Sequence, residues 1–313
     1  MKAILLKEFG SVDNLEITDI PTPRIQQDEV LVEVKAISIN PVDLKIRRGA
    51  KMVDRAKDPL PMILGWDISG IITETGADVK NFKTGDEVFA MINYPEAGKA
   101  YAAFVVAKPG HLAVKPVNVS FSESAAATLS ALTAWQALTV YGQVKKGDKV
   151  LIHAASGGVG HYAVQMAKHL GAYVIGTSSA ANREFVLNLG ADEHIDYQSQ
   201  AVEKLVSDLD FILDPLGGTN TALSLDITKK GGTVVSIVFG FTEDLFNKAK
   251  VLGINAHNPQ VRPNGDHMKV IAELLNKGVV KSHVSQHFNL AQIRDAHLLL
   301  ESGRSVGKIT LEV

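Results

Sequence analysis

The chain has 313 residues, a formal net charge of −2, a hydrophobic content of 46% and no cysteine. This length suits two domains of ordinary size, and the near-neutral charge without a basic block argues against nucleic acid as a partner. The missing cysteines exclude disulfides, cysteine–zinc sites and thiol nucleophiles. The apolar start of the chain is too short for a signal peptide, and no apolar run approaches the roughly 20 residues of a membrane span. We therefore expect a cytoplasmic protein without membrane contact.

Short β-type runs alternate with turn residues as far as residue 118. The expected strands cover residues 2–7, 30–37, 68–75, 87–92 and 101–106. Pro21-Thr-Pro23, Thr84-Gly-Asp86 and Pro109-Gly110 mark turns or loops between them. The pattern is typical of a compact, mostly antiparallel β domain.

After residue 118, expected strands and helices alternate. The strands cover 150–154, 173–177, 194–195, 210–214, 233–238 and 253–256, and the helices cover 161–170, 182–189, 220–227 and 243–252. Lys229-Lys-Gly-Gly232 is expected to be a turn. Repeated strand–helix units with nearly continuous apolar strands predict a doubly wound parallel sheet, which is a Rossmann domain.

The tail has a third rhythm, with expected helices at 267–276 and 290–301 and strands at 283–288 and 308–313. We expect the tail to return to the first domain. The predicted α/β fold is then a parallel Rossmann sheet, residues 119–262, inserted in a discontinuous β domain formed by residues 1–118 and 263–313. The active site is expected in the cleft between the two.

The segment from Val150 to Gly160 carries the strongest functional signal. An apolar strand leads into Ala155-Ser-Gly-Gly-Val-Gly160 and then into a helix, which is the context of a dinucleotide-binding turn. Ser156, Gly157 and Gly158 are expected to approach a pyrophosphate, and Gly160 to let helix and strand pack closely. Glycine turns also occur for ordinary steric reasons, so the strand–helix context carries the prediction.

The next strand end indicates which cofactor is bound. NAD-binding domains usually place an acid about 20 residues past the glycines, but Thr177-Ser-Ser-Ala-Ala-Asn-Arg183 contains none. The hydroxyls of Ser178 and Ser179 and the guanidinium of Arg183 suit a 2′-phosphate, which favours NADPH over NADH. The alternative is that the serines cap a helix and Arg183 is a solvated surface charge.

Several motifs occur in order along the chain. They are Asn40-Pro-Val-Asp43-x-Lys45, Leu64-Gly65-x-Asp67, Thr84-Gly-Asp-x-Val88, the glycine turn, Asp214-x-x-Gly-Gly218 and Gly303-x-x-x-Gly-Lys308. Together they resemble the medium-chain dehydrogenase/reductase superfamily, in its zinc-free quinone oxidoreductase-like branch. The resemblance implies a GroES-like catalytic domain split around the Rossmann domain.

The chain departs from zinc-dependent members at their ligand positions. Those enzymes carry Cys where this chain has Asn40, and Gly-His-Glu where it has Gly65-Trp66-Asp67. His283 and His287 have metal-like spacing, but they lie on an expected strand without a nearby Glu. We therefore expect no metal.

Without a metal, a conjugated acceptor is the expected substrate. A quinone or an α,β-unsaturated carbonyl (enone) spreads the charge left by hydride addition, so hydrogen-bond donors suffice. The resemblance places Asn40, Asp43 and Lys45 on the loop that faces the nicotinamide, with Asn40 and Lys45 as donors. Asp43 either caps a helix, orients Lys45 or transfers a proton. The alternative for Lys45 and Arg47 is a solvated basic helix face.

The resemblance also implies further cofactor contacts and an assembly. It places Thr133 and Val159 at the nicotinamide ring, Tyr197 at the adenosine phosphate, and Phe239 and Arg262 where main chain approaches the carboxamide. Core packing is an equal alternative for Val159 and Phe239. A homodimer is expected by analogy alone. The competing function is an NADPH-binding protein with little turnover that acts as a structural or redox-sensing partner.

Overall fold

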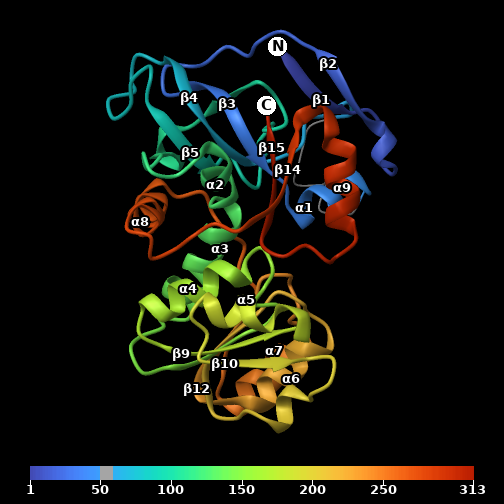
Figure 1. The fold of residues 1–313 in the computed structure, drawn as a ribbon, viewed down its shortest axis with the longest axis vertical. Coiled ribbons are helices and arrows are strands. Elements are labelled where there is room, and N and C mark those ends of the chain that lie inside the picture. The colour runs from blue at the N-terminus through green and yellow to red at the C-terminus, as the bar shows by residue number, and fades with distance from the viewer. Residues whose placement is uncertain (50–58) are drawn as a thin grey trace. The chain divides into compact units, whose positions relative to one another are not determined.

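The computed structural model describes residues 1–49 and 59–313, and these residues form two compact units. The first unit combines Met1–Leu132 with Arg262–Val313, and the second is Thr133–Val261. The first unit thus runs past residue 118, where the sequence pattern changes, because helix α2 (Phe121–Ala126) packs on strands of the first sheet (Figure 1). The sequence makes the loop at residues 52–61 a candidate for shaping the substrate pocket, and most of it lies outside the described residues.

The first unit contains a sheet with the strand order β14-β15-β3-β4-β5-β7, with β6 paired to β3. Its pairs are antiparallel except β14–β15, which is parallel. A separate two-stranded sheet joins β1 and β2. The strands are β1 (Lys2–Leu6), β2 (Leu15–Asp19), β3 (Val30–Ser38), β4 (Asp67–Thr75), β5 (Glu87–Met91), β6 (Phe104–Ala107), β7 (Ala113–Val114), β14 (Val284–Asn289) and β15 (Lys308–Glu312). The tail therefore completes the first sheet, as the sequence predicted.

The register at one end of β3 brings together residues that are far apart in the chain. Ser38, the last residue of β3, lies opposite Asp67 on one neighbouring strand and Thr310 on the other. Lys308 opens β15 two residues before Thr310, and Asn40 follows the end of β3. Because β15 and β4 flank β3 and run antiparallel to it, Asn40, Asp67 and Lys308 meet at this end of the sheet.

Helices of the first unit begin at recognisable signals. Helix α1 (Pro41–Arg47) starts after Asn40 with proline at its first position, where a missing N–H is tolerated. It packs on α9 (Ile293–Glu301), and α8 (Gly265–Asn276) packs on β7. Helix α3 (Leu129–Gln136) starts in the first unit and ends in the second.

The second unit is a six-stranded parallel sheet with the order β10-β9-β8-β11-β12-β13. The strands are β8 (Lys149–Ile152), β9 (Tyr173–Ser178), β10 (Glu193–Asp196), β11 (Leu209–Asp214), β12 (Thr228–Ser236) and β13 (Asn255–His257). The helices between them are α4 (Gly160–His169), α5 (Arg183–Asn188), α6 (Thr219–Ile227) and α7 (Glu243–Leu252). From β8 the chain adds β9 and β10 on one side of the sheet, and from β11 it adds β12 and β13 on the other. Right-handed crossovers therefore place α4 and α5 on one face, and α6 and α7 on the other.

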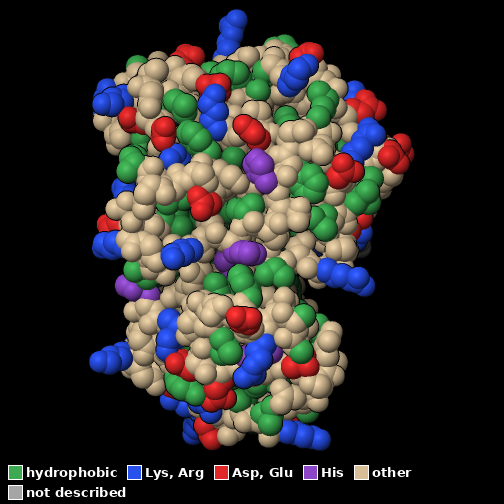
Figure 2. All heavy atoms as spheres, in the orientation of Figure 1, with side chains coloured by type: hydrophobic (Ala, Val, Ile, Leu, Met, Phe, Trp, Pro, Cys, Tyr) green, Lys and Arg blue, Asp and Glu red, His purple; other side chains and the backbone are tan. Residues whose placement is uncertain are grey.

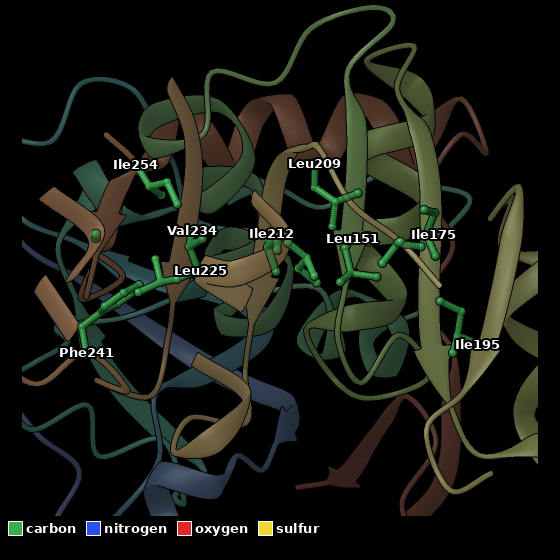
Figure 3. Close-up of a cluster of buried hydrophobic side chains, with 12 residues drawn as sticks. Leu151, Ile175, Ile195, Leu209, Ile212, Leu225, Val234, Phe241 and Ile254 are labelled. Atoms are coloured by element: carbon green, nitrogen blue, oxygen red, sulfur yellow. The ribbon is translucent and has the colours of Figure 1, made fainter. Parts of the chain in front are cut away.

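Apolar side chains pack across this parallel sheet in one row. Val234, Ile212, Leu151 and Ile175 lie directly opposite one another on four adjacent strands, so their side chains share one face. Figure 3 shows this row, with Phe241 packed near its end. Burial on both faces explains why these strands are nearly continuous apolar runs in the sequence.

One expected turn is part of a strand instead. Residues 229–232 belong to β12, whose pairing with β11 shifts register between Leu209 and Phe211. A Cβ on Gly232 would lie 2.8 Å from the Leu209 carbonyl oxygen. The glycine permits this close backbone approach at an irregular strand pair.

The surface carries no concentrated charge on the face in view. Lys and Arg side chains alternate there with Asp and Glu (Figure 2). No helix among the described residues is long and apolar enough to span a membrane.

Candidate functional site

Three buried polar side chains form the centre of the first unit's candidate site. The Asn40 side-chain amide donates to Asp67 Oδ2 at 2.7 Å, and its oxygen accepts from Lys308 Nζ at 2.5 Å. Lys308 also donates to the Ile39 carbonyl oxygen at 2.9 Å and lies 3.8 Å from Asp67 Oδ2. The other oxygen of Asp67 accepts from the Leu129 N–H at 3.0 Å, at the start of α3. The amide of Asn40 is therefore fixed in one orientation, between an anion and a cation.

The charges of this cluster depend on each other. Asp67 and Lys308 have exposures of 0% and 4%. Burial raises the pKa of Asp67 and lowers the pKa of Lys308, and each charge offsets the shift of the other. Sequence reasoning missed Lys308 as a site residue, although it noted the Gly303-x-x-x-Gly-Lys308 motif, because a lysine that opens a strand ordinarily faces solvent.

Asp43 continues the cluster along helix α1. Its carboxylate accepts from the Asn40 backbone N–H at 2.7 Å, which is the capping role weighed from the sequence. Burial raises the pKa of Asp43 to about 7, and the hydrogen bond from Asn40 offsets part of that shift.

A second buried pair is formed by Tyr101 and His297. Tyr101, fully buried, lies with its hydroxyl 3.1 Å from His297 Nε2. Burial and the nearby Arg47 charge lower the pKa of His297 to about 3, so this histidine is neutral at pH 7.

The two basic residues of α1 have different environments. Lys45 is exposed, whereas Arg47 is buried, pairs with Glu301 of α9 and donates to the Gly10 carbonyl oxygen. A solvated basic face is therefore wrong for Arg47. Its position four residues C-terminal to Asp43 turns it toward α9, where the fold supplies a carboxylate.

The glycine turn of the second unit has the close contacts that its pattern predicts. A Cβ on Gly160 would lie 2.1 Å from the Ala154 carbonyl oxygen and 2.8 Å from Ala155 Cα. Only glycine fits there, because helix α4 leaves the strand at this point. Ser156 is buried and its hydroxyl accepts from Asn182 at 3.2 Å. His153 is packed between the hydroxyls of Thr177 and Ser224, and burial lowers its pKa.

The end of β9 differs in part from expectation. Ser178 is buried, lies 2.8 Å from His194 Nε2 and donates to the Ser179 carbonyl oxygen. Ser179 is partly exposed and Arg183 is exposed. Of the three predicted phosphate ligands, Arg183 is thus freely accessible, whereas the Ser178 hydroxyl is engaged inside the protein. His194 was not among the residues predicted at this strand end, because it belongs to the next strand, β10.

The remaining predicted cofactor residues lie in varied surroundings. Thr133 is buried in α3, and Val159 precedes the first residue of α4. Tyr197 and Phe239 are 58% and 46% exposed, and Phe239 has a φ of 59°. Such exposure contradicts core packing for Phe239. Arg262 is exposed and belongs to the first unit, whereas the glycine turn belongs to the second.

Comparisons with known proteins cover nearly the whole chain. Residues 26–116 match the alcohol dehydrogenase GroES-like domain, and residues 189–311 match a family described as zinc-binding dehydrogenase. A 2-methylene-furan-3-one reductase of Solanum lycopersicum is 33% identical over 99% of this chain and 79% of its own length. An NADPH-dependent alkenal/one oxidoreductase of Arabidopsis thaliana is 32% identical with the same coverage. The quinone oxidoreductase structure from Coxiella burnetii has a TM-score of 0.94 and 35% identity, over 100% of this chain and 99% of its own.

The chain belongs to the medium-chain dehydrogenase/reductase superfamily. It lies in the quinone oxidoreductase-like branch, and it is an oxidoreductase. The predicted fold class is confirmed, with a mixed, largely antiparallel GroES-like sheet and a parallel Rossmann sheet.

The donor set at the superfamily's zinc positions does not suit zinc in this member. Asn40 bonds both Asp67 and the Lys308 ammonium, and this ammonium, 3.8 Å from Asp67 Oδ2, repels a cation. Trp66 is buried and its indole N–H donates to the Glu96 carbonyl oxygen at 2.6 Å. Over residues 1–49 and 59–313, no three His, Cys, Asp or Glu side chains are grouped to hold a metal.

Proposed function

We propose that this protein is an NADPH-dependent, metal-independent reductase that transfers hydride to a quinone or an enone. The observation that carries the proposal is the Lys308 ammonium, bonded to Asn40 and facing Asp67 at the superfamily's zinc-ligand positions. With a buried ammonium in this place, the site has no room for the Lewis-acid metal ion that reduction of a simple ketone needs. The names of the relatives from tomato and Arabidopsis, a methylene-furanone reductase and an alkenal/one oxidoreductase, support conjugated substrates.

Apart from Arg262, the second unit supplies the residues that would hold NADPH. The turn from Ser156 to Gly160 would hold the pyrophosphate on backbone N–H groups, and Ser179 and Arg183 the 2′-phosphate. Following the superfamily pattern, we assign Thr133, Val159, Phe239 and Arg262 to the nicotinamide end and Tyr197 to the adenosine end. When bound, the cofactor supplies the hydride.

The first unit supplies polar groups for the acceptor. The Asn40 amide has a second N–H besides the one donated to Asp67, and the position of that N–H is set by Lys308. We assign this N–H and the Lys45 ammonium to the oxygen that gains charge in the reaction. Asp43 holds a proton near neutral pH because burial raises its pKa to about 7, which suits a proton-holding role behind Asn40.

Turnover separates the proposal from its competitor. The purified protein is incubated with NADPH and a panel of short quinones and enones, and NADPH oxidation is followed by absorbance. We expect turnover of at least one class. Tight NADPH binding without turnover across the panel would favour the structural or redox-sensing role instead.

Two variants test the assigned residues. Arg183→Ala should raise KM for NADPH about tenfold and leave KM for NADH unchanged, because one charge-assisted bond to the phosphate is lost. Lys45→Ala should lower kcat/KM on the order of a hundredfold without changing NADPH affinity, and more for enones than for quinones. Wild-type rates in Lys45→Ala would return Lys45 to the solvated-face interpretation that its exposure also fits.

The assembly and location are part of the same proposal. By analogy with the superfamily we propose a cytoplasmic homodimer. Analytical ultracentrifugation and fractionation of the source cells test the two statements separately.

A further inference from the structure

The parallel sheet brings a carboxylate to the residues assigned to the 2′-phosphate. Strand β10 runs parallel to β9, and Asp196, its last residue, lies opposite Ser178, the last residue of β9. Parallel neighbours end at the same edge of a sheet, and cofactors of this fold bind outside that edge. Asp196 therefore lies at the proposed cofactor edge although it follows Arg183 by a complete helix and a turn.

Local hydrogen bonds hold Asp196 in its ionised form. Its carboxylate accepts from the Ser199 hydroxyl at 2.6 Å and from the Gln198 N–H at 3.1 Å. These bonds, together with one from the Ala180 N–H, hold the pKa of Asp196 below its usual range. Ala180 follows Ser179 in the chain, so the negative charge lies against the segment that leaves β9.

A cation also lies near this strand end, because Arg183 opens α5 and α5 packs on β10. Burial lowers the pKa of His194, and the Arg183 guanidinium contributes to the same shift. His194 contacts Ser178 at 2.8 Å, and Asp196 is near enough to His194 for the two to influence each other's pKa. A 2′-phosphate, with close to two negative charges at pH 7, would meet both an attractive guanidinium and a repulsive carboxylate here.

We propose that Asp196 is a specificity-determining residue that weakens binding of the cofactor's 2′-phosphate and so limits the preference for NADPH that Arg183 provides. The inference rests on the proposed NADPH function and deepens it. A carboxylate also suits the ribose 2′-hydroxyl of NADH. Its usual place is the end of the second strand, which is β9 here, and Asp196 lies at the same sheet edge on β10. The balance between Asp196 and Arg183 then sets the ratio in which the two cofactors are used.

Direct binding tests this without requiring turnover. The affinities of the full-length wild-type and Asp196→Asn proteins for 2′,5′-ADP and for 5′-AMP are measured by calorimetry. We expect Asp196→Asn to bind 2′,5′-ADP on the order of fivefold more tightly, as removal of one like charge at a solvent-screened site predicts. Binding of 5′-AMP should not tighten. The gain should shrink at high salt, because exposed charges are screened.

Two control variants separate charge from local structure. Glu193→Gln removes the same charge from the opposite end of β10 and should leave both affinities unchanged. Ser199→Ala removes a hydrogen bond to Asp196 but keeps its charge, and should not reproduce the selective gain.

The outcomes are distinct. An unchanged ratio of 2′,5′-ADP to 5′-AMP affinity in Asp196→Asn, or an equal gain in Ser199→Ala or Glu193→Gln, would overturn the inference alone. If the wild-type protein binds neither nucleotide, the proposed function fails and the inference fails with it. A gain confined to Asp196→Asn and to 2′,5′-ADP supports the assignment, and the ratio of kcat/KM for NADPH over NADH should rise in parallel.

Discussion

Replacing Lys308 with methionine should be among the most destabilising single changes in the first unit. Methionine keeps most of the length of the lysine side chain but removes the ammonium that bonds Asn40 and Ile39 and faces Asp67. The Asp67 carboxylate would then be buried without a cation. It would keep the bonds from the Asn40 amide and the Leu129 N–H, and neither donor carries a charge.

The burial of the pair sets the expected magnitude. The Lys308 and Asp67 side chains are 4% and 0% exposed, so the relevant precedent is a buried ion pair with one partner removed, which costs about 3–5 kcal/mol. The matched control is Lys2→Met in the same unit. Lys2 and Asp19 form an ion pair at 3.4 Å with side chains 66% and 77% exposed, and such pairs contribute about 0–1 kcal/mol.

Urea unfolding of four proteins measures the difference: wild type, Lys308→Met, Lys2→Met and the double variant Lys308→Met/Asp67→Asn. The double variant should recover much of the lost free energy of unfolding, because no uncompensated charge remains. In Lys308→Met the folded-state pKa of Asp67 lies above its unfolded value. The loss in free energy of unfolding of Lys308→Met relative to wild type should therefore shrink as pH falls, because Asp67 then takes up a proton. A cost for Lys308→Met no larger than that for Lys2→Met, or a double variant as unstable as Lys308→Met, would refute the reasoning.

Three further outcomes are expected. Burial raises the pKa of Asp43 from 3.8 to about 7, so its contribution to stability is complete below the lower value and is lost as pH rises through the higher one. The resulting change in the free energy of unfolding between the two pH limits is on the order of 4 kcal/mol, and Asp43→Asn should remove it. Urea unfolding at several pH values measures this, and a plot of stability against pH for Asp43→Asn that runs parallel to wild type would contradict the assignment. Gly160→Ala should lower the free energy of unfolding by about 1–3 kcal/mol and weaken NADPH binding, because its Cβ would lie 2.1 Å from the Ala154 carbonyl oxygen. Fluorescence titration measures the affinity, and a wild-type value would count against the turn as the pyrophosphate site. Reductase activity should survive exhaustive treatment with EDTA or phenanthroline, and inactivation that added zinc restores would contradict the metal-independent proposal.

Local sequence patterns determined much of the fold. Alternating and continuous apolar runs predicted strands such as β3 and β11, and the expected helix at residues 243–252 coincides with α7. The glycine turn was predictable because its requirement is local, namely that a helix leaves a strand where no Cβ fits, as at Gly160. The residues expected to form a turn at 229–232 lie inside β12, where Gly232 approaches β11, and no local pattern reveals that partner strand.

Only the tertiary structure decided the composition of the two candidate sites. Lys308 meets Asn40 because β15, from the end of the chain, inserts beside β3 in a particular register. Asp196 meets the end of β9 because β10 runs parallel to it, and an acid is therefore present although the stretch after β9 contains none. Residue spacing along a chain encodes which face of an element is apolar, but it does not encode strand order or register, which depend on how all the elements pack.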